Sequence, residues 1–279
     1  MTLPNFLIIG AAKAGTTSLY DWLRQHPDVF MPAFKEPKFF AWDGASGGGG
    51  PVVQVTRRAD YEALFAGAGG ATAIGEASTL YLTHPRAPER AAAAIPAARL
   101  IASLRDPVER AFSIYQMNLR LFGANAGLDF PAALRADPAL RQGYHPALTR
   151  WRAHFDPGQL RVILFEDLAR DAPGTLAGLF GFLGVDPGFA PDVTKVANPG
   201  GLPRSRRLHR LLTDPRLRAL GRNLLPAAAL DRLRGLRGRN LQRQALEPAA
   251  RAAAVAVFRD DILKTQDLIG RDLSAWLRA

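Results

Sequence analysis

The sequence lacks cysteine, long apolar runs and a basic start. The absence of cysteine from its 279 residues excludes a disulfide framework, a thiol nucleophile and a zinc or iron–sulfur site held by cysteine. No run of 18 apolar residues occurs, so no segment is predicted to span a membrane. The first six residues lack the basic stretch that begins a secretory signal, and we therefore expect a cytoplasmic protein.

Positive charge is abundant and unevenly distributed. Lys and Arg number 36 against 25 Asp and Glu, a net charge of +11. Residues 203–243 contain twelve Arg, no Lys and two Asp, so this Arg-rich segment alone carries a net +10. It is either a solvated helical surface or a surface that attracts an anionic partner, such as a nucleotide, an acidic glycan, nucleic acid or a membrane surface. Because no aromatic residue interrupts it, the segment does not favour stacking on single-stranded nucleic acid.

The apolar pattern predicts alternating strands and helices. Buried strands are expected at 6–9, 74–78, 100–104 and 160–165, with helices at 88–94, from Pro107 with Asp106 as its cap, and through 176–183. The Gly-rich stretch 44–56 predicts a mobile loop, and helix is expected over most of 204–279. This order predicts an α/β fold with a parallel sheet covered on both faces, in a single domain over 1–279.

A glycine-rich turn follows the first strand and opens a helix. Its sequence, from Gly10 to Ser18, is Gly-Ala-Ala-Lys-Ala-Gly-Thr-Thr-Ser. Backbone N–H groups at a helix start, an ammonium and hydroxyls together suit a phosphate, although an ordinary strand–helix turn with an incidental lysine is the alternative. Lys13 stands two positions before the second glycine, out of register for an ATP-binding Walker loop, and Arg105 follows the 100–104 strand where a metal-holding acid would be needed.

These residues resemble a known family. Residues 6–26 resemble the 5′-phosphosulfate loop of sulfotransferases that use 3′-phosphoadenosine 5′-phosphosulfate (PAPS), in particular the carbohydrate and heparan-sulfate type. Residues 99–115 resemble that family's 3′-phosphate motif, in which a strand ends in Arg-Asp-Pro and a serine follows on the next helix. Segments 75–82, 198–207 and 268–277 are also similar to members of the family, so the likeness extends over nearly the whole chain.

The resemblance implies a P-loop-type three-layer α/β/α fold with a helical C-terminal part, and a role for each matching residue. Glu36, ahead of an aromatic pair, would be the catalytic base, and Lys13 would stabilise charge on the departing phosphate oxygen; no metal is implied. The 5′-phosphosulfate would be held by Lys13, Ala14, Gly15, Thr16, Thr17 and Ser18, and the 3′-phosphate by Arg105, Ser113, Arg204 and Ser205.

Each of these roles has a structural alternative. Arg105 could pair with Asp106 or Glu109, Ser113 could bond its own helix backbone, and Glu36 could be a turn residue paired with a neighbouring lysine. Trp42 and Tyr81 could stack on a sugar, although core packing is the more common role of such rings.

The expected activity is transfer of a sulfuryl group from PAPS to a hydroxyl of a carbohydrate or glycolipid. Some N-sulfating relatives carry two histidines on the helix that bears the motif serine, and residues 115–121 contain none. Two alternatives are an ATP- and Mg²⁺-dependent phosphotransferase and a non-enzymatic binder of nucleic acid or anionic membrane through 203–243. If the protein is a sulfotransferase, we expect no nucleic-acid partner and no membrane span, while association with a membrane surface is compatible with the sequence.

Overall fold

The computed structural model describes residues 2–42, 54–125, 127–194, 202–203, 205, 241–242 and 244–279. Most of the Gly-rich stretch 44–56 and of the Arg-rich segment 203–243 lies outside the described residues, as does Arg204. The chain divides into two compact units. The first comprises Met1–Arg110, Gln142–Ala197 and Phe258–Arg278; the second comprises Ala111–Arg141 and Asn198–Val257, together with Ala279.

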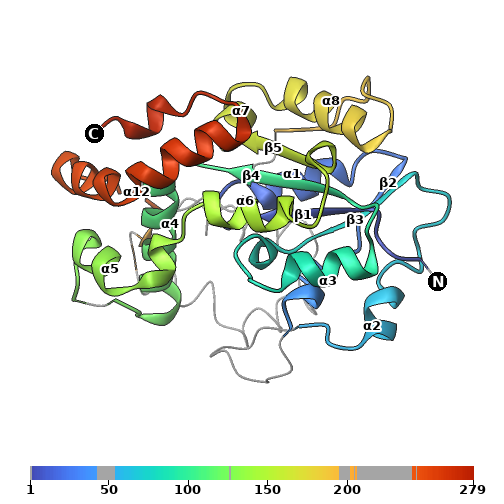
Figure 1. Ribbon diagram of the computed structural model, residues 1–279, viewed down its shortest axis with the longest axis horizontal. Coiled ribbons are helices and arrows are strands. Elements are labelled where there is room, and N and C mark those ends of the chain that lie inside the picture. The colour runs from blue at the N-terminus through green and yellow to red at the C-terminus, as the bar shows by residue number, and fades with distance from the viewer. Residues whose placement is uncertain are drawn as a thin grey trace. The chain divides into compact units, whose positions relative to one another are not determined.

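A five-stranded parallel sheet forms the centre of the first unit (Figure 1). In spatial order its strands are β2 (Val29–Phe30), β3 (Ala73–Ala77), β1 (Phe6–Gly10), β4 (Arg99–Leu104) and β5 (Leu160–Leu164). All four neighbouring pairs are parallel. The α/β class and the parallel sheet predicted from the sequence are therefore confirmed. Within this sheet, β2 is the strand that the sequence did not indicate, because it is too short to give an apolar pattern.

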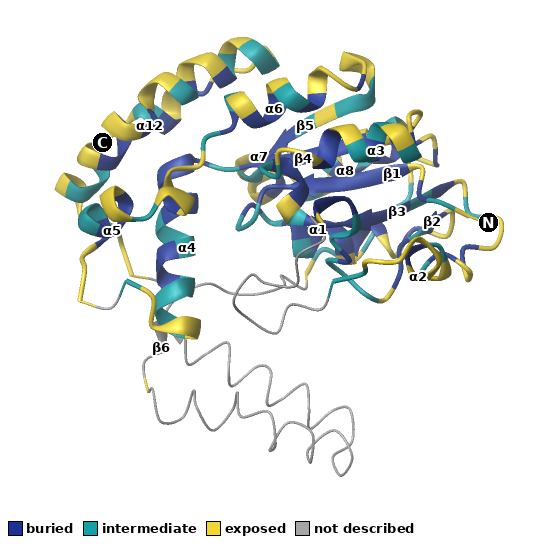
Figure 2. Cartoon of the chain, turned by 60° about the horizontal axis from the view of Figure 1, so that its bottom comes forward, coloured by how far each residue is buried: buried dark blue, intermediate teal, exposed yellow. Residues whose placement is uncertain are grey.

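The strands are apolar because helices cover both faces of the sheet. Every residue of β1 is buried, as expected for a strand in a parallel sheet (Figure 2). The helices α1 (Thr16–Leu23) and α8 (Ala172–Leu183) pack their apolar stripes against one face, in a core that includes Leu19, Ile101 and Phe180. On the other face, α3 (Ala87–Ala94) and α6 (His145–Arg152) lie in front of the strands in Figure 1.

The strand order creates a switch point at the carboxyl edge of the sheet. From β1 the chain passes to β2 and β3 on one side, and then crosses over β1 to reach β4 and β5 on the other. Ligand sites in open parallel sheets form at such a point, outside the carboxyl ends of the strands. Because β1 and β4 are paired, with Ile8 beside Ile101 and Gly10 beside Ala102, the turns that follow these two strands meet at this edge.

Shorter elements complete the first unit. The predicted helix after β4 begins at Pro107, and its cap is confirmed: Asp106 Oδ1 accepts from the N–H groups of Val108 (2.9 Å) and Glu109 (3.3 Å). This helix, α4 (Pro107–Phe122), continues into the second unit. The remaining elements are η1 (Phe39–Ala41), α2 (Arg58–Ala63), η2 (Thr79–Leu82), η4 (Pro157–Gln159), α7 (Phe165–Arg170), the end of α12 (Pro248–Ile269) and η5 (Ser274–Leu277).

The second unit contains the rest of α4, α5 (Phe130–Ala136), η3 (Pro138–Arg141) and the beginning of α12. Phe130 packs against Phe112 and Tyr115, with ring centroids 5.2 and 5.7 Å apart. At the ends of the Arg-rich segment, β6 (Leu202–Pro203) and β7 (Leu241–Gln242) form an antiparallel pair; β7 lies within 204–279, most of which was expected to be helical. In the part of the chain that the structure describes, no helix is long and apolar enough to cross a membrane.

Candidate active site

The turn between β1 and α1 needs its glycines. Gly15 has a φ of +79°, and a Cβ there would come 2.9 Å from Cδ2 of Phe165. Gly10 has a φ of +152°, and its Cβ would come 2.7 Å from that of Leu82. Lys13, with a φ of 67°, shares the left-handed conformation without being glycine. The backbone of this turn is thus held close to neighbouring elements at both ends, in a conformation that a helix or strand could not supply.

The turn leads directly into the first residues of α1. Gly15 is the cap of this eight-residue helix, and no side chain accepts a hydrogen bond at the cap. The first-turn N–H groups of a helix lie at the positive end of its dipole, where an anion's oxygens can accept from them. The residues there, Thr16, Thr17 and Ser18, add hydroxyl donors. This donor set fits a phosphate or sulfate group.

Arg105, directly after β4, lies beside the turn. Its Nη1 donates to the carbonyl oxygen of Lys13 (3.3 Å), and its Nη2 pairs with Glu109 Oε2 (3.2 Å). The hydroxyl of Tyr144 donates to the Arg105 carbonyl (2.7 Å) and accepts from its N–H (3.3 Å), which fixes the backbone at the strand end. The two motifs therefore stand together, and the ion pair with Glu109 that was the alternative for Arg105 is also present.

One aromatic ring supports both motifs. The guanidinium carbon of Arg105 lies 5.0 Å from the ring centroid of Phe165, and the same ring faces Gly15. Phe165 follows β5 at the carboxyl edge of the sheet. The sequence indicated it only as the last residue of an apolar strand, so its place in the site was missed; its position at a strand end was the available signal.

Glu36 stands at the same edge, on the segment between β2 and η1. The backbone N–H of Thr79 donates to Glu36 Oε2 (3.0 Å), and its hydroxyl donates to Oε1 (3.0 Å). Lys35 Nζ also donates to Oε1 (3.0 Å), so the lysine pairing proposed as an alternative exists. The Thr79 carbonyl oxygen lies against Gly10, 3.1 Å from the position of an added Cβ. Thr79 thus connects the carboxylate of Glu36 with the beginning of the glycine turn.

A second acidic side chain, Glu76, is fully buried. It lies on β3, and its Oε1 accepts from the hydroxyls of Tyr81 (2.6 Å) and Tyr61 (3.2 Å). Burial raises the pKa of Glu76 from 4.5 to about 7, and the hydrogen bond from Tyr81 opposes the rise. Tyr81 is itself fully buried, so it packs in the core and cannot stack on a sugar from solution. Trp42 is 38% exposed.

The other predicted residues belong to the second unit or lie outside the described residues. Ser113 is half-buried on α4, within the second unit. Ser205 is exposed and also belongs to that unit. Arg204 is outside the described residues. Of the predicted set, the first unit therefore brings together the turn at 13–18, Arg105 and Glu36.

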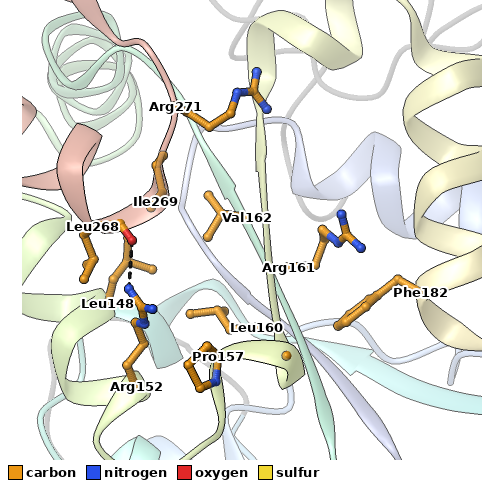
Figure 3. Close-up of a pocket in the computed structure, with 11 residues that line it drawn as sticks. Leu148, Arg152, Pro157, Leu160, Arg161, Val162, Phe182, Leu268, Ile269 and Arg271 are labelled. Carbon is orange, nitrogen blue, oxygen red and sulfur yellow. Dashed lines mark hydrogen bonds between the residues drawn. The ribbon is translucent and has the colours of Figure 1, made fainter.

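A cavity of about 370 Å³ lies along the edge strand β5, away from these motifs (Figure 3). Three arginines face it, and each has a partner: Arg152 donates to the Leu268 carbonyl (2.7 Å), Arg271 pairs with Asp167 (2.9 Å), and Arg161 lies over an aromatic ring. These contacts join α6 to the end of α12, α7 to the segment after α12, and β5 to α8. The lining contains none of the predicted site residues; it comprises Leu148, Arg152, Pro157, Gly158, Leu160, Arg161, Val162, Phe182, Leu268, Ile269 and Arg271.

Acidic and histidine side chains do not gather into a metal site in the described ranges. No group of three or more such residues there could hold a metal ion. The donors at the carboxyl edge are instead amides, hydroxyls, an ammonium and a guanidinium.

Comparison with known proteins matches this chain to sulfotransferases. The sulfotransferase family model matches residues 54–190. The human bifunctional heparan sulfate N-deacetylase/N-sulfotransferase 3 is 31% identical over 210 residues, which are 67% of this chain and 23% of that protein. The membrane-associated sulfotransferase kil1 of Dictyostelium discoideum is 32% identical over 125 residues, 45% of this chain and 25% of kil1. The chain thus spans about a quarter of the length of these curated relatives.

Solved structures extend the likeness to the whole chain. A sulfotransferase from Alicyclobacillus acidocaldarius superposes with a TM-score of 0.75 and 29% identity, covering 100% of both chains. A mouse sulfotransferase complexed with PAP shares the fold, with a TM-score of 0.52 and 14% identity over 96% of this chain and 86% of that one. The matched family model, the related sequences and the full-length structural match agree: this chain belongs to the sulfotransferase family of transferase enzymes.

Proposed function

We propose that the protein transfers a sulfuryl group from PAPS to a hydroxyl group, on a carbohydrate or glycolipid acceptor. The observation that carries the proposal is the hydrogen bond from Arg105 to the carbonyl of Lys13 at the switch point of the sheet. It brings the guanidinium at the end of β4 into contact with the turn that leads into α1, a helix whose start has no side-chain cap. Two separate anionic groups on one small molecule, such as the phosphates of PAPS, suit two such neighbouring sites.

The residues present fit the donor nucleotide. The amides and hydroxyls of Thr16, Thr17 and Ser18, together with Lys13, would hold the 5′-phosphosulfate, with the backbone of Ala14 and Gly15 completing the loop. Arg105 would bind the 3′-phosphate by the guanidinium edge that now pairs with Glu109. Family resemblance alone supports adding Ser113, Arg204 and Ser205 to the 3′-phosphate residues. When bound, PAPS supplies the sulfuryl group for transfer.

Glu36 would accept the proton of the acceptor hydroxyl. Its carboxylate is held by Thr79 and Lys35 and its side chain remains 27% exposed, so it is oriented and still accessible. A positioned general base of this kind contributes about 10²–10⁴-fold to the rate. Lys13 and the first-turn N–H groups of α1 would stabilise the negative charge that develops on the phosphate oxygen of the leaving group.

The acceptor class rests on the relatives and on one departure from them. The human relative is named as an N-deacetylase/N-sulfotransferase of heparan sulfate, a carbohydrate. N-sulfation is disfavoured here because residues 115–121 of α4 contain no histidine. We therefore propose a hydroxyl rather than an amine as the accepting group.

Calorimetric titration with PAP and with 5′-AMP tests the donor. We expect PAP to bind at least about tenfold more tightly, because only PAP carries the 3′-phosphate that Arg105 would contact. Arg105→Ala should weaken PAP binding about 10–100-fold and change AMP binding by less than about twofold. Glu109→Gln removes the ion pair but keeps the guanidinium, so it should retain the preference for PAP.

Equal affinity of the wild-type protein for PAP and AMP would contradict the proposal. Transfer of labelled sulfate from PAPS into the host's glycans and lipids, with the product identified by mass, then tests the acceptor. A product sulfated on an amine would overturn the choice of a hydroxyl.

A further inference from the structure

The segment that carries Glu36 has an unusual backbone. Glu36 and Lys38 both adopt positive φ values, 63° and 57°, although neither is glycine. For residues other than glycine this conformation is unfavourable in free energy, and they keep it only where surrounding contacts impose it. The contacts that impose it therefore decide where the Glu36 carboxylate lies.

Three alternate N–H groups tie this segment to the end of β3 and to η2. Glu36 N–H donates to the Ala77 carbonyl (3.0 Å), and Lys38 N–H donates to Ser78 Oγ (2.9 Å). The third, from Phe40, donates to the hydroxyl of Tyr81 (3.3 Å). The Tyr81 hydroxyl can accept this bond only if its own hydrogen points elsewhere.

Glu76 fixes the direction of that hydrogen. Tyr81 donates to Glu76 Oε1 at 2.6 Å, which leaves the lone pairs of its oxygen to the Phe40 N–H. Burial and the charge of Glu76 raise the pKa of Tyr81 well above its ordinary value, so the hydroxyl stays a donor. The path from Glu76 to the Glu36 segment is thus two consecutive hydrogen bonds.

A second path runs through Tyr61. Its hydroxyl donates to the same Glu76 oxygen (3.2 Å), and its ring stacks on Phe39, with centroids 4.3 Å apart. Phe39 and Phe40 are consecutive residues of η1, so both paths reach the same short element. The other carboxyl oxygen of Glu76, Oε2, is buried and has no hydrogen-bond partner in the structure. A fully buried carboxyl that only filled space would be replaced at lower cost by an apolar side chain.

We propose that Glu76 is a positioning residue that holds the Glu36 segment in place by accepting hydrogen bonds from Tyr81 and Tyr61. The inference rests on the proposed function, in which Glu36 is the base, and adds the buried group that sets its position. Acceptance by Oε1 is the property that matters, and it is the same whether Oε2 carries a proton or not.

Two substitutions separate acceptance from charge and from volume. Glu76→Gln keeps a carbonyl acceptor at Oε1, whereas Glu76→Leu keeps the volume and removes the acceptor. In the sulfate-transfer assay we expect Glu76→Gln to stay within about threefold of the wild-type kcat, and Glu76→Leu to lose about 10–100-fold with PAP affinity unchanged. Full activity of a folded Glu76→Leu protein would overturn the proposal, and so would a Glu76→Gln protein as slow as Glu76→Leu.

Amide hydrogen exchange tests the positioning independently of catalysis. Protection of the Phe40 N–H group should fall in Glu76→Leu and persist in Glu76→Gln, because its acceptor, the Tyr81 hydroxyl, is directed by Glu76. If Glu76→Leu does not fold, Tyr81→Phe removes the acceptor for Phe40 alone and should lower both protection and kcat. If protection is unchanged in these variants, the positioning role is refuted. If protection falls as expected but the wild-type protein transfers no sulfate from PAPS, the proposed function is refuted instead.

Discussion

At the scale of single residues, the site depends on side chains whose partners fix their direction. Glu36 receives three hydrogen bonds, two of them from Thr79, and Arg105 divides its guanidinium between Lys13 and Glu109. A carboxylate and a guanidinium held in this way lose little further freedom when a substrate binds.

The role of Glu36 is tested by Glu36→Gln. The amide keeps the size of the side chain but cannot accept a proton, so kcat should fall about 10²–10⁴-fold while PAP affinity stays near that of the wild type. Steady-state kinetics with calorimetry of PAP binding gives both quantities. Glu89→Gln, at an exposed glutamate on α3, is the matched control and should change neither. Undiminished turnover in Glu36→Gln would remove this residue from the mechanism.

At the scale of elements, the start of α1 combines a left-handed glycine cap with a close neighbour. Gly15 is left-handed and faces the ring of Phe165, whereas Gly178 in the middle of α8 has no atom within 4 Å of an added Cβ. Substitution by alanine is therefore expected to have opposite effects on stability at these two positions.

Gly15→Ala should lower the free energy of unfolding by about 1–3 kcal/mol and weaken PAP binding, because the new Cβ meets both a positive φ and an aromatic ring. Gly178→Ala should raise the free energy of unfolding by about 0.5–1 kcal/mol and leave PAP binding unchanged, because alanine is the better helix former. Urea unfolding and calorimetry measure both effects. A stabilised Gly15→Ala protein would contradict the conformation described for the turn.

The elements also show where sequence reasoning succeeds. The strands at β1, β4 and β5 and the Asp106 cap could be predicted because continuous apolar runs and an Asp-Pro pair are local signals. The glycine turn and Arg105 could be matched to a family for the same reason. Glu76, Thr79 and Phe165 could not be assigned roles, because their importance arises from contacts in the folded protein that no local sequence pattern indicates: Glu76 with Tyr61, Thr79 with Glu36, and Phe165 with Arg105.

At the scale of the whole molecule, burial of Glu76 links stability to pH. Its pKa is raised from 4.5 to about 7 in the folded protein. A carboxyl with a raised pKa favours folding while it is protonated, so its contribution is fully present below about pH 4.5 and is lost as the pH rises through 7. The cost reaches the order of 3 kcal/mol above pH 7.

Replacing Glu76 by Gln removes this titration. The free energy of unfolding of the wild type, relative to Glu76→Gln, should therefore fall by on the order of 3 kcal/mol between about pH 4 and pH 8. Urea unfolding of both proteins across this range measures the difference, with Glu89→Gln, at an exposed glutamate, as the control substitution. A constant difference between wild type and Glu76→Gln would show that Glu76 keeps an ordinary pKa.

The position of the Phe165 ring limits how the affinity for the proposed donor nucleotide can change. It lies under the guanidinium of Arg105 and against the Gly15 corner at the same time. A larger or smaller residue there would disturb both, so under the proposed function the binding of both ends of the donor nucleotide would weaken together. A substitution of Phe165 therefore cannot change one of these two contacts without the other. Independent changes must come from residues that contact only one of them.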